Sequence, residues 1–205
     1  MDWVDVALVV DMSGSMGMIR DETIRGFNRY IKSLKSETRG NVSITTVLFN
    51  GNQVTKSRYS DVKNVPDLDC RSYVPDGTTP LYDAIRSAIN TLDVSDGKKK
   101  ILVILTDGYE NSSKETTQSW VQDAIKNRQN SGWVVVYLGA GKDSWGQGMT
   151  ISVSAQDTIE FNKDDIGVAF ATLACSTVNF VNSTDDNEKT SKLPFFHKID
   201  GLTVD

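Results

Sequence analysis

Histidine, cysteine and long apolar stretches are scarce in this chain, and each shortage excludes a class of protein. Its 205 residues include one histidine, His197, and two cysteines, Cys70 and Cys175, with no CxxC pair. This set argues against a zinc site, and one histidine far along the chain argues against Ser-His and Cys-His nucleophiles. The two isolated thiols are expected to stay reduced.

The chain also lacks long apolar runs and an excess of basic residues, which argues against a membrane protein and a nucleic-acid-binding protein. No apolar run approaches the roughly 20 residues that cross a bilayer. The formal net charge is -5, whereas binding to nucleic acid or an anionic membrane favours a basic surface. The first residues lack the basic region of a secretory signal. We therefore expect a cytoplasmic protein with neither a nucleic-acid nor a membrane partner.

Strand-like and helical patterns alternate along the chain, which is typical of an α/β fold. We predict a three-layer α/β/α sandwich with a mostly parallel central sheet. Asn50-Gly51 is a hairpin signal, so one edge strand is predicted to be antiparallel. The predicted domain is 1–182, followed by a C-terminal tail, 183–205, whose Leu193-Pro-Phe-Phe196 segment is expected to dock back on the domain. The predicted strands are 5–10, 42–49, 53–59, 101–106 and 133–138, with short extended pieces at 151–153 and 158–161; the predicted helices are 21–36, one beginning near 79–80, 116–130, 143–148 and 164–181.

Oxygen-bearing side chains gather in three segments, each at the end of a predicted strand or the start of a predicted helix. These are 11–15 (Asp-Met-Ser-Gly-Ser), 76–80 (Asp-Gly-Thr-Thr-Pro) and 106–108 (Thr-Asp-Gly). Loops at the carboxyl ends of parallel strands meet at one edge of the sheet. Because carboxylates and hydroxyls are hard ligands, the sequence predicts a site for Mg²⁺ or Mn²⁺ there.

The same segments resemble the metal-ion-dependent adhesion site of von Willebrand factor A domains. The DxSxS motif is Asp11, Ser13 and Ser15, Thr79 precedes Pro-Leu-Tyr-Asp, and Asp107 lies in Leu-Thr-Asp-Gly. The resemblance covers about residues 3–181. It implies that the two serine hydroxyls bind the metal, and that Thr79 and the two aspartates bind it directly or through water. The chain looks most similar to small intracellular bacterial or phage-borne members.

This resemblance implies a protein-binding role and no enzymatic activity. When only one of the two carboxylates binds the ion directly, the ion stays electron-poor and keeps an open position. An Asp or Glu of a partner protein then completes its coordination, and such a charge-assisted contact dominates a small interface. We therefore expect a metal-dependent adaptor or scaffold module.

Three alternatives stay open. Thr78 competes with Thr79 for the threonine position. A strand ending in aspartate also opens Mg²⁺-dependent phosphatases of the haloacid-dehalogenase type, although these need an acid where this chain has Ser13. The protein could also be a scaffold of the same fold that binds its partner without metal. A nucleotide site at Gly139-Ala-Gly-Lys142 is disfavoured, because the rest of the glycine pattern and the GK[ST] ending are missing.

Overall fold

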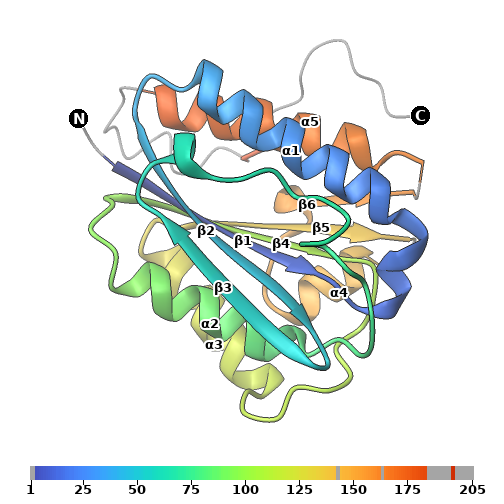
Figure 1. Cartoon of the computed structure of the whole chain (residues 1–205). Coiled ribbons are helices and arrows are strands. Elements are labelled where there is room, and N and C mark those ends of the chain that lie inside the picture. The colour runs from blue at the N-terminus through green and yellow to red at the C-terminus, as the bar shows by residue number, and fades with distance from the viewer. Residues whose placement is uncertain (1–2, 142–143, 163, 184–194, 197–205) are drawn as a thin grey trace.

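The computed structural model describes residues 3–141, 144–162, 164–183 and 195–196. Strands and helices alternate along these residues (Figure 1). The strands are β1 (Trp3–Asp11), β2 (Asn41–Asn50), β3 (Gln53–Tyr59), β4 (Lys99–Thr106), β5 (Val134–Ala140) and β6 (Thr158–Phe161). The helices are α1 (Arg20–Glu37), α2 (Leu81–Asp93), α3 (Gln118–Asn130), α4 (Ser144–Thr150) and α5 (Ile166–Asn182), with short 3₁₀ turns at Gly14–Ile19, Val62–Asn64 and Ala155–Asp157.

The strands form one sheet in the order β3-β2-β1-β4-β5-β6. All neighbouring strands run parallel except β2 and β3, which pair antiparallel and are joined by the two-residue loop Gly51-Asn52. The predicted fold class is therefore confirmed, including its antiparallel edge strand.

Helices cover both faces of the sheet, so the parallel strands are buried on both sides. Helices α1 and α5 lie over one face, and α2 and α3 lie over the other (Figure 1). Alternate residues of β1 enter different cores: Val6 and Leu8 pack with α1 and α5, whereas Ala7 and Val9 pack with α2 and α3. Among the described residues, no helix is both long and apolar enough to span a membrane.

The stretch predicted to be extended at 151–153 is a turn, so this part of the prediction is wrong. The N–H groups of Ile151 and Val153 both donate to the carbonyl of Gly148, at 3.1 and 2.9 Å. Ser152 between them has a φ of 67°, which is incompatible with a strand. These local hydrogen bonds override the apolar character of the two flanking residues. The second predicted piece, 158–161, is confirmed as β6.

The aromatic residues near the C-terminus pack against the domain. Phe195 and Phe196 both contact the core on the α1–α5 side of the sheet. The Phe195 ring lies edge-on to Phe180 of α5, with 6.0 Å between ring centroids. The docking expected for this segment is thus seen for its two phenylalanines, while Leu193, Pro194 and His197 lie outside the described residues.

Candidate metal centre

The predicted metal-binding segments converge where the strand order reverses. Strands β2 and β4 both pair with β1, one on each side. Connections leave β1 and β4 in opposite directions, and the resulting crevice at their carboxyl ends is where ligands bind in open α/β sheets. Asp11 is the last residue of β1, and Asp107 directly follows β4. The fold thus brings two carboxylates that are far apart in sequence to one crevice.

Backbone hydrogen bonds join the loop of residues 11–15 to the loop of residues 76–80. The Gly14 N–H donates to the carbonyl of Gly77 at 3.0 Å, and the Asp76 N–H donates to the carbonyl of Met12 at 3.0 Å. Gly77 has a φ of +71°, which a residue with a side chain adopts only with strain. Two backbone hydrogen bonds therefore join these two loops directly.

Hydrogen-bonded side-chain oxygens join the 11–15 segment to Asp107, and the Thr79 hydroxyl lies beside Gly108. The Ser13 and Ser15 hydroxyl oxygens are 3.2 Å apart, and the Ser15 hydroxyl donates to Asp107 Oδ1 at 2.5 Å. A Cβ placed on Gly108 would lie 3.6 Å from Thr79 Oγ1 and 3.7 Å from Ser15 Oγ. Gly108 therefore lies within van der Waals range of both hydroxyls.

The neighbouring threonines, Thr78 and Thr79, face different parts of the molecule. Thr79 is 3% exposed and its hydroxyl lies close to Gly108 in the crevice. The Thr78 hydroxyl instead lies against Gly51 in the β2–β3 hairpin, and the residue is exposed. Thr79, which the following Pro-Leu-Tyr-Asp favoured over Thr78, is thus the threonine whose hydroxyl lies near Gly108.

Asp11 is a fully buried carboxylate whose hydrogen-bond partners, within the described chain, are neutral. Its Oδ1 accepts from the Ser13 N–H at 2.7 Å, and its Oδ2 accepts from the Thr106 hydroxyl at 2.6 Å. Burial raises the pKa of Asp11 to about 6, against the lowering effect of these hydrogen bonds, and the nearby negative charge of Asp107 raises it further. A buried carboxylate beside a second one, with hydroxyls around both, is a donor set that fits a hard divalent cation.

Three residues that support the site were not identified from the sequence as partners of the ligands. Thr106 donates to Asp11, as described above. Asn111 holds Thr79 from both sides: its Oδ1 accepts from the Thr79 N–H at 2.8 Å, and its own N–H donates to the Thr79 carbonyl at 3.2 Å. The third is Tyr73, whose hydroxyl donates to the Asp11 carbonyl at 2.5 Å. Asn111 and Tyr73 carry no local signal, because their partners are distant in sequence.

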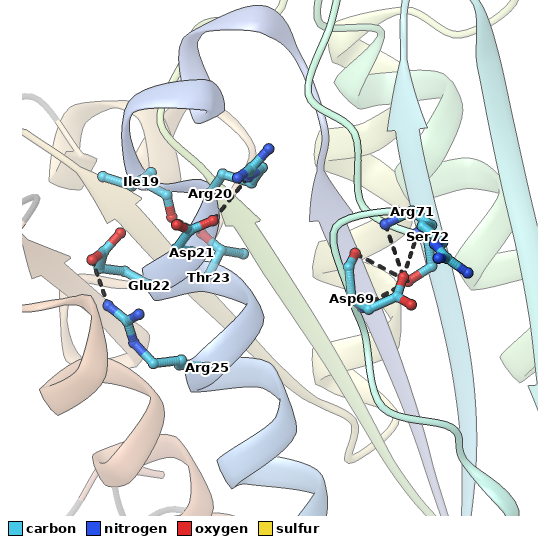
Figure 2. A network of polar contacts seen from close by, with 9 residues as sticks. All are labelled: Ile19, Arg20, Asp21, Glu22, Thr23, Arg25, Asp69, Arg71 and Ser72. Carbon is cyan, nitrogen blue, oxygen red and sulfur yellow. Dashed lines mark hydrogen bonds and ion pairs between the residues drawn. The ribbon is translucent and has the colours of Figure 1, made fainter.

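A tight turn, drawn in Figure 2, precedes Tyr73. The Asp69 carboxylate accepts from the backbone N–H groups of Ser72, at 2.8 Å, and Arg71, at 2.9 Å. These donors stabilise the charged form and hold the pKa of Asp69 below its ordinary value. The turn closes when the Tyr73 N–H donates to the Asp69 carbonyl at 3.0 Å. The loop that runs from Asp69 to Tyr73 is thereby tied to the end of β1 at Asp11.

The sequence also matches a family model. The model of the von Willebrand factor type A domain matches residues 5–174, most of the chain. The chain belongs to this family. Von Willebrand factor A domains are commonly protein-interaction modules, and the match covers all five residues predicted to bind metal. That these five residues hold an ion in this chain stays a prediction.

Solved structures show the same fold at low sequence identity. The von Willebrand factor domain of the type V pili tip protein Mfa5 from Porphyromonas gingivalis is 14% identical, with a TM-score of 0.71 over 92% of this chain and 99% of that one. The pilus adhesin SpaC from Lactobacillus rhamnosus GG is 16% identical, with a TM-score of 0.68 over 88% of this chain and 30% of that one. The PilB minor pilin from Streptococcus sanguinis is 16% identical, with a TM-score of 0.62 over 88% of this chain and 62% of that one. This von Willebrand factor A chain thus spans less than two thirds of the length of SpaC and of PilB. A comparison with curated protein sequences finds no match.

Proposed function

We propose that this chain is a divalent-metal-dependent protein-binding module. In this proposal Mg²⁺ or Mn²⁺ is held by Asp11, Ser13, Ser15, Thr79 and Asp107, and a carboxylate of a partner protein completes its coordination. The observation that carries the proposal is the convergence of two carboxylates and three hydroxyls, from three separate loops, at the switch point of the sheet.

The charge distribution supports a cation in this crevice. Asp11 is completely buried and has only neutral hydrogen-bond partners in the described chain. A buried carboxylate without an opposite charge is costly, and its raised pKa reflects that cost. A bound divalent ion would supply the missing positive charge and serve as a Lewis acid for one further oxygen ligand. The hydroxyls of Ser13, Ser15 and Thr79 add oxygen donors without adding negative charge, which leaves the ion able to attract a carboxylate.

Calorimetric titration with Mg²⁺ and with Mn²⁺ tests the metal site. We expect saturable binding to the wild-type domain and at least about a hundredfold weaker binding to Asp11→Ala, because a direct or water-linked charge is lost. The adjacent threonines provide a matched pair: Thr79→Ala should weaken binding clearly, and Thr78→Ala should leave it unchanged. Equal affinities for the wild type and Asp11→Ala would overturn the proposed site.

The partner's carboxylate is tested by competition. Peptides selected for binding to the Mg²⁺-loaded domain should be released by EDTA and should lose affinity when their Asp or Glu is replaced by Asn or Gln. Binding that survives both EDTA and this replacement would mean that the domain is a scaffold that recognises partners without metal.

A further inference from the structure

A groove of about 200 Å³ lies between α1 and α5, which lie side by side on the same face of the sheet (Figure 1). The two helices run in the same direction. A Cβ on Gly26 would overlap the Phe170 ring near their starts, and the Asn182 side chain donates to the Glu37 carbonyl at 3.0 Å near their ends. The groove is lined by Arg29, Ser33 and Glu37 of α1 and by a row of α5 that includes Ala171, Ala174 and Cys175.

Helix α5 presents an uncharged face to solvent. From Ile166 to Asn182 it contains no Asp, Glu, Lys or Arg. Val168 is 41% exposed, and Ala171 and Cys175 are exposed as well. A surface helix usually carries charged residues on its outer side, and one without them is typically buried. The composition of α5 therefore indicates that another protein surface covers it.

The described part of the C-terminal segment does not cover this groove. Phe195 packs against Phe180 on α5, with 6.0 Å between ring centroids. Neither Phe180 nor Phe195 lines the groove. The uncharged face that includes Ala171 and Cys175 is thus left without a partner among the described residues.

Two opposite charges on α1 lie at opposite ends of the groove. Arg29 and Glu37 are both exposed and both line it, with Ser33 midway between them. Eight residues of helix separate the two charges by about 12 Å, which is too far for them to pair with each other. Within the described part of the chain, neither side chain makes a hydrogen bond or an ion pair. Both charges are therefore available to another molecule.

We propose that a second copy of this chain docks on the groove, with α1 antiparallel to α1 and α5 antiparallel to α5. A two-fold axis at the level of Ser33 brings Arg29 of each copy opposite Glu37 of the other, so the same ion pair forms twice. The parallel two-fold arrangement would place α1 on α5, where both charges would face an uncharged helix and lose hydration without a partner. The short side chains of α5 allow its two copies to approach closely. The inference does not rest on the proposed function.

Charge reversal tests the symmetric contact. We expect the full chain to form a dimer that sedimentation equilibrium detects at concentrations up to about 1 mM. Arg29→Glu and Glu37→Arg should each weaken dimerisation at least about tenfold, because each places like charges opposite each other twice. Combining both substitutions in one chain exchanges the charges and should restore dimerisation, and an equimolar mixture of the two single variants should form a heterodimer. Lys32→Glu is the matched control, since Lys32 is exposed on α1 outside the groove.

Cross-linking through Cys175 tests how the two copies are arranged. In a Cys70→Ser chain, Cys175 is the single thiol, and it is exposed. Cys175 and Ser33 both line the groove, so the two thiols of an antiparallel pair lie near the two-fold axis. A short bismaleimide should therefore link two chains, and Arg29→Glu should reduce the yield severalfold.

Metal binding provides an independent readout. Mg²⁺ affinity should be the same in all these variants, because Arg29, Lys32, Glu37 and Cys70 are outside the proposed ligand set. A chain that stays monomeric at about 1 mM would overturn the proposal and would mean that a different protein or the residues after Asn182 cover the groove. A dimer that both single variants weaken and the combined variant does not restore would overturn the antiparallel arrangement.

Discussion

Strand β1 carries a buried aspartate near each end, and the two have different surroundings. Asp5 is 3% exposed and Asp11 is 0% exposed. Asp5 accepts from the Ser43 hydroxyl on one oxygen and from the Gly97 N–H, at 2.8 Å, on the other. Gly97 is packed so closely that a Cβ on it would overlap Asp5 Oδ2. Asp5 is therefore enclosed by protein and tied to two other segments.

Asp11 is also buried, but it lies at the carboxyl end of β1, beside the other predicted metal ligands. Its partners are a loop N–H and the Thr106 hydroxyl, and a second carboxylate, Asp107, lies nearby. Hydroxyls of Ser13 and Ser15 continue from it toward Asp107. The comparison shows that burial of a carboxylate does not by itself identify a binding site. The residues around the carboxylate decide whether its charge stabilises contacts within the protein or can bind a ligand.

Replacing each aspartate by asparagine should affect stability by different amounts. At pH 7, without metal, Asp11→Asn should stabilise the fold by about 2 kcal/mol, because it removes a buried charge that lies near the negative charge of Asp107. Asp5→Asn should change stability by less than about 1 kcal/mol, because its amide donates to the Ser43 hydroxyl while its oxygen still accepts from the Gly97 N–H. Urea unfolding in EDTA measures both, and an equal shift for the two variants would break the comparison.

Gly97→Ala tests the enclosure of Asp5. The added methyl group overlaps the carboxylate and approaches the Asp5 backbone, so we expect a loss of about 3 kcal/mol in the free energy of unfolding. Gly167→Ala, in α5, is the control: nothing lies within 4 Å of its Cβ position, and alanine there should be neutral or slightly stabilising. Mg²⁺ affinity should be unchanged in both variants. A loss below about 1 kcal/mol for Gly97→Ala would mean that the contact relaxes easily.

The pH dependence of metal-free stability should come in part from Asp11. Because its folded pKa, about 6, is above its unfolded value of 3.8, the fold binds the proton more tightly. Its stabilising contribution is therefore present below about pH 4 and lost as pH rises through about 6. Between pH 4 and 7, the stability of the wild type relative to Asp11→Asn should fall by about 2 kcal/mol. Unfolding curves of both proteins in EDTA test this, and a constant difference would contradict it.

The smallest effect concerns the hydrogen bond that anchors the end of β1. Tyr73→Phe removes the hydroxyl that donates to the Asp11 carbonyl at 2.5 Å, and should cost about 1 kcal/mol. Tyr30→Phe is the matched control: Tyr30 is also fully buried, but among the described residues its hydroxyl makes a single, long contact, with Thr177 at 3.3 Å. We expect a smaller loss for Tyr30→Phe by thermal unfolding. A larger loss than for Tyr73→Phe would show that the Asp11 carbonyl gains little from this bond.

Much of the fold was predictable because its signals are local. The apolar runs of β1 and β4 and the stripe of Phe27, Ile31 and Leu34 on α1 follow from side-chain periodicity. The Asn50-Gly51 turn likewise identified the hairpin between β2 and β3. Prediction was wrong at 151–153, where hydrogen bonds to the Gly148 carbonyl and a positive φ at Ser152 replaced an extended strand. Composition does not reveal such a turn.

For the candidate site, the sequence by itself determined which residue types are present and where they lie along the chain. Local patterns predict that their segments follow a strand or precede a helix, and the residues concerned are Asp11, Ser13, Ser15, Thr79 and Asp107. Only the tertiary structure decided how they meet. It placed the Thr79 hydroxyl near Gly108 and the Thr78 hydroxyl against Gly51, and it brought Asp11 close to Asp107 while packing Asp5 against Gly97. The physical reason is that periodicity and turn chemistry act over a few residues, whereas burial, close approach and hydrogen bonding join residues distant in sequence.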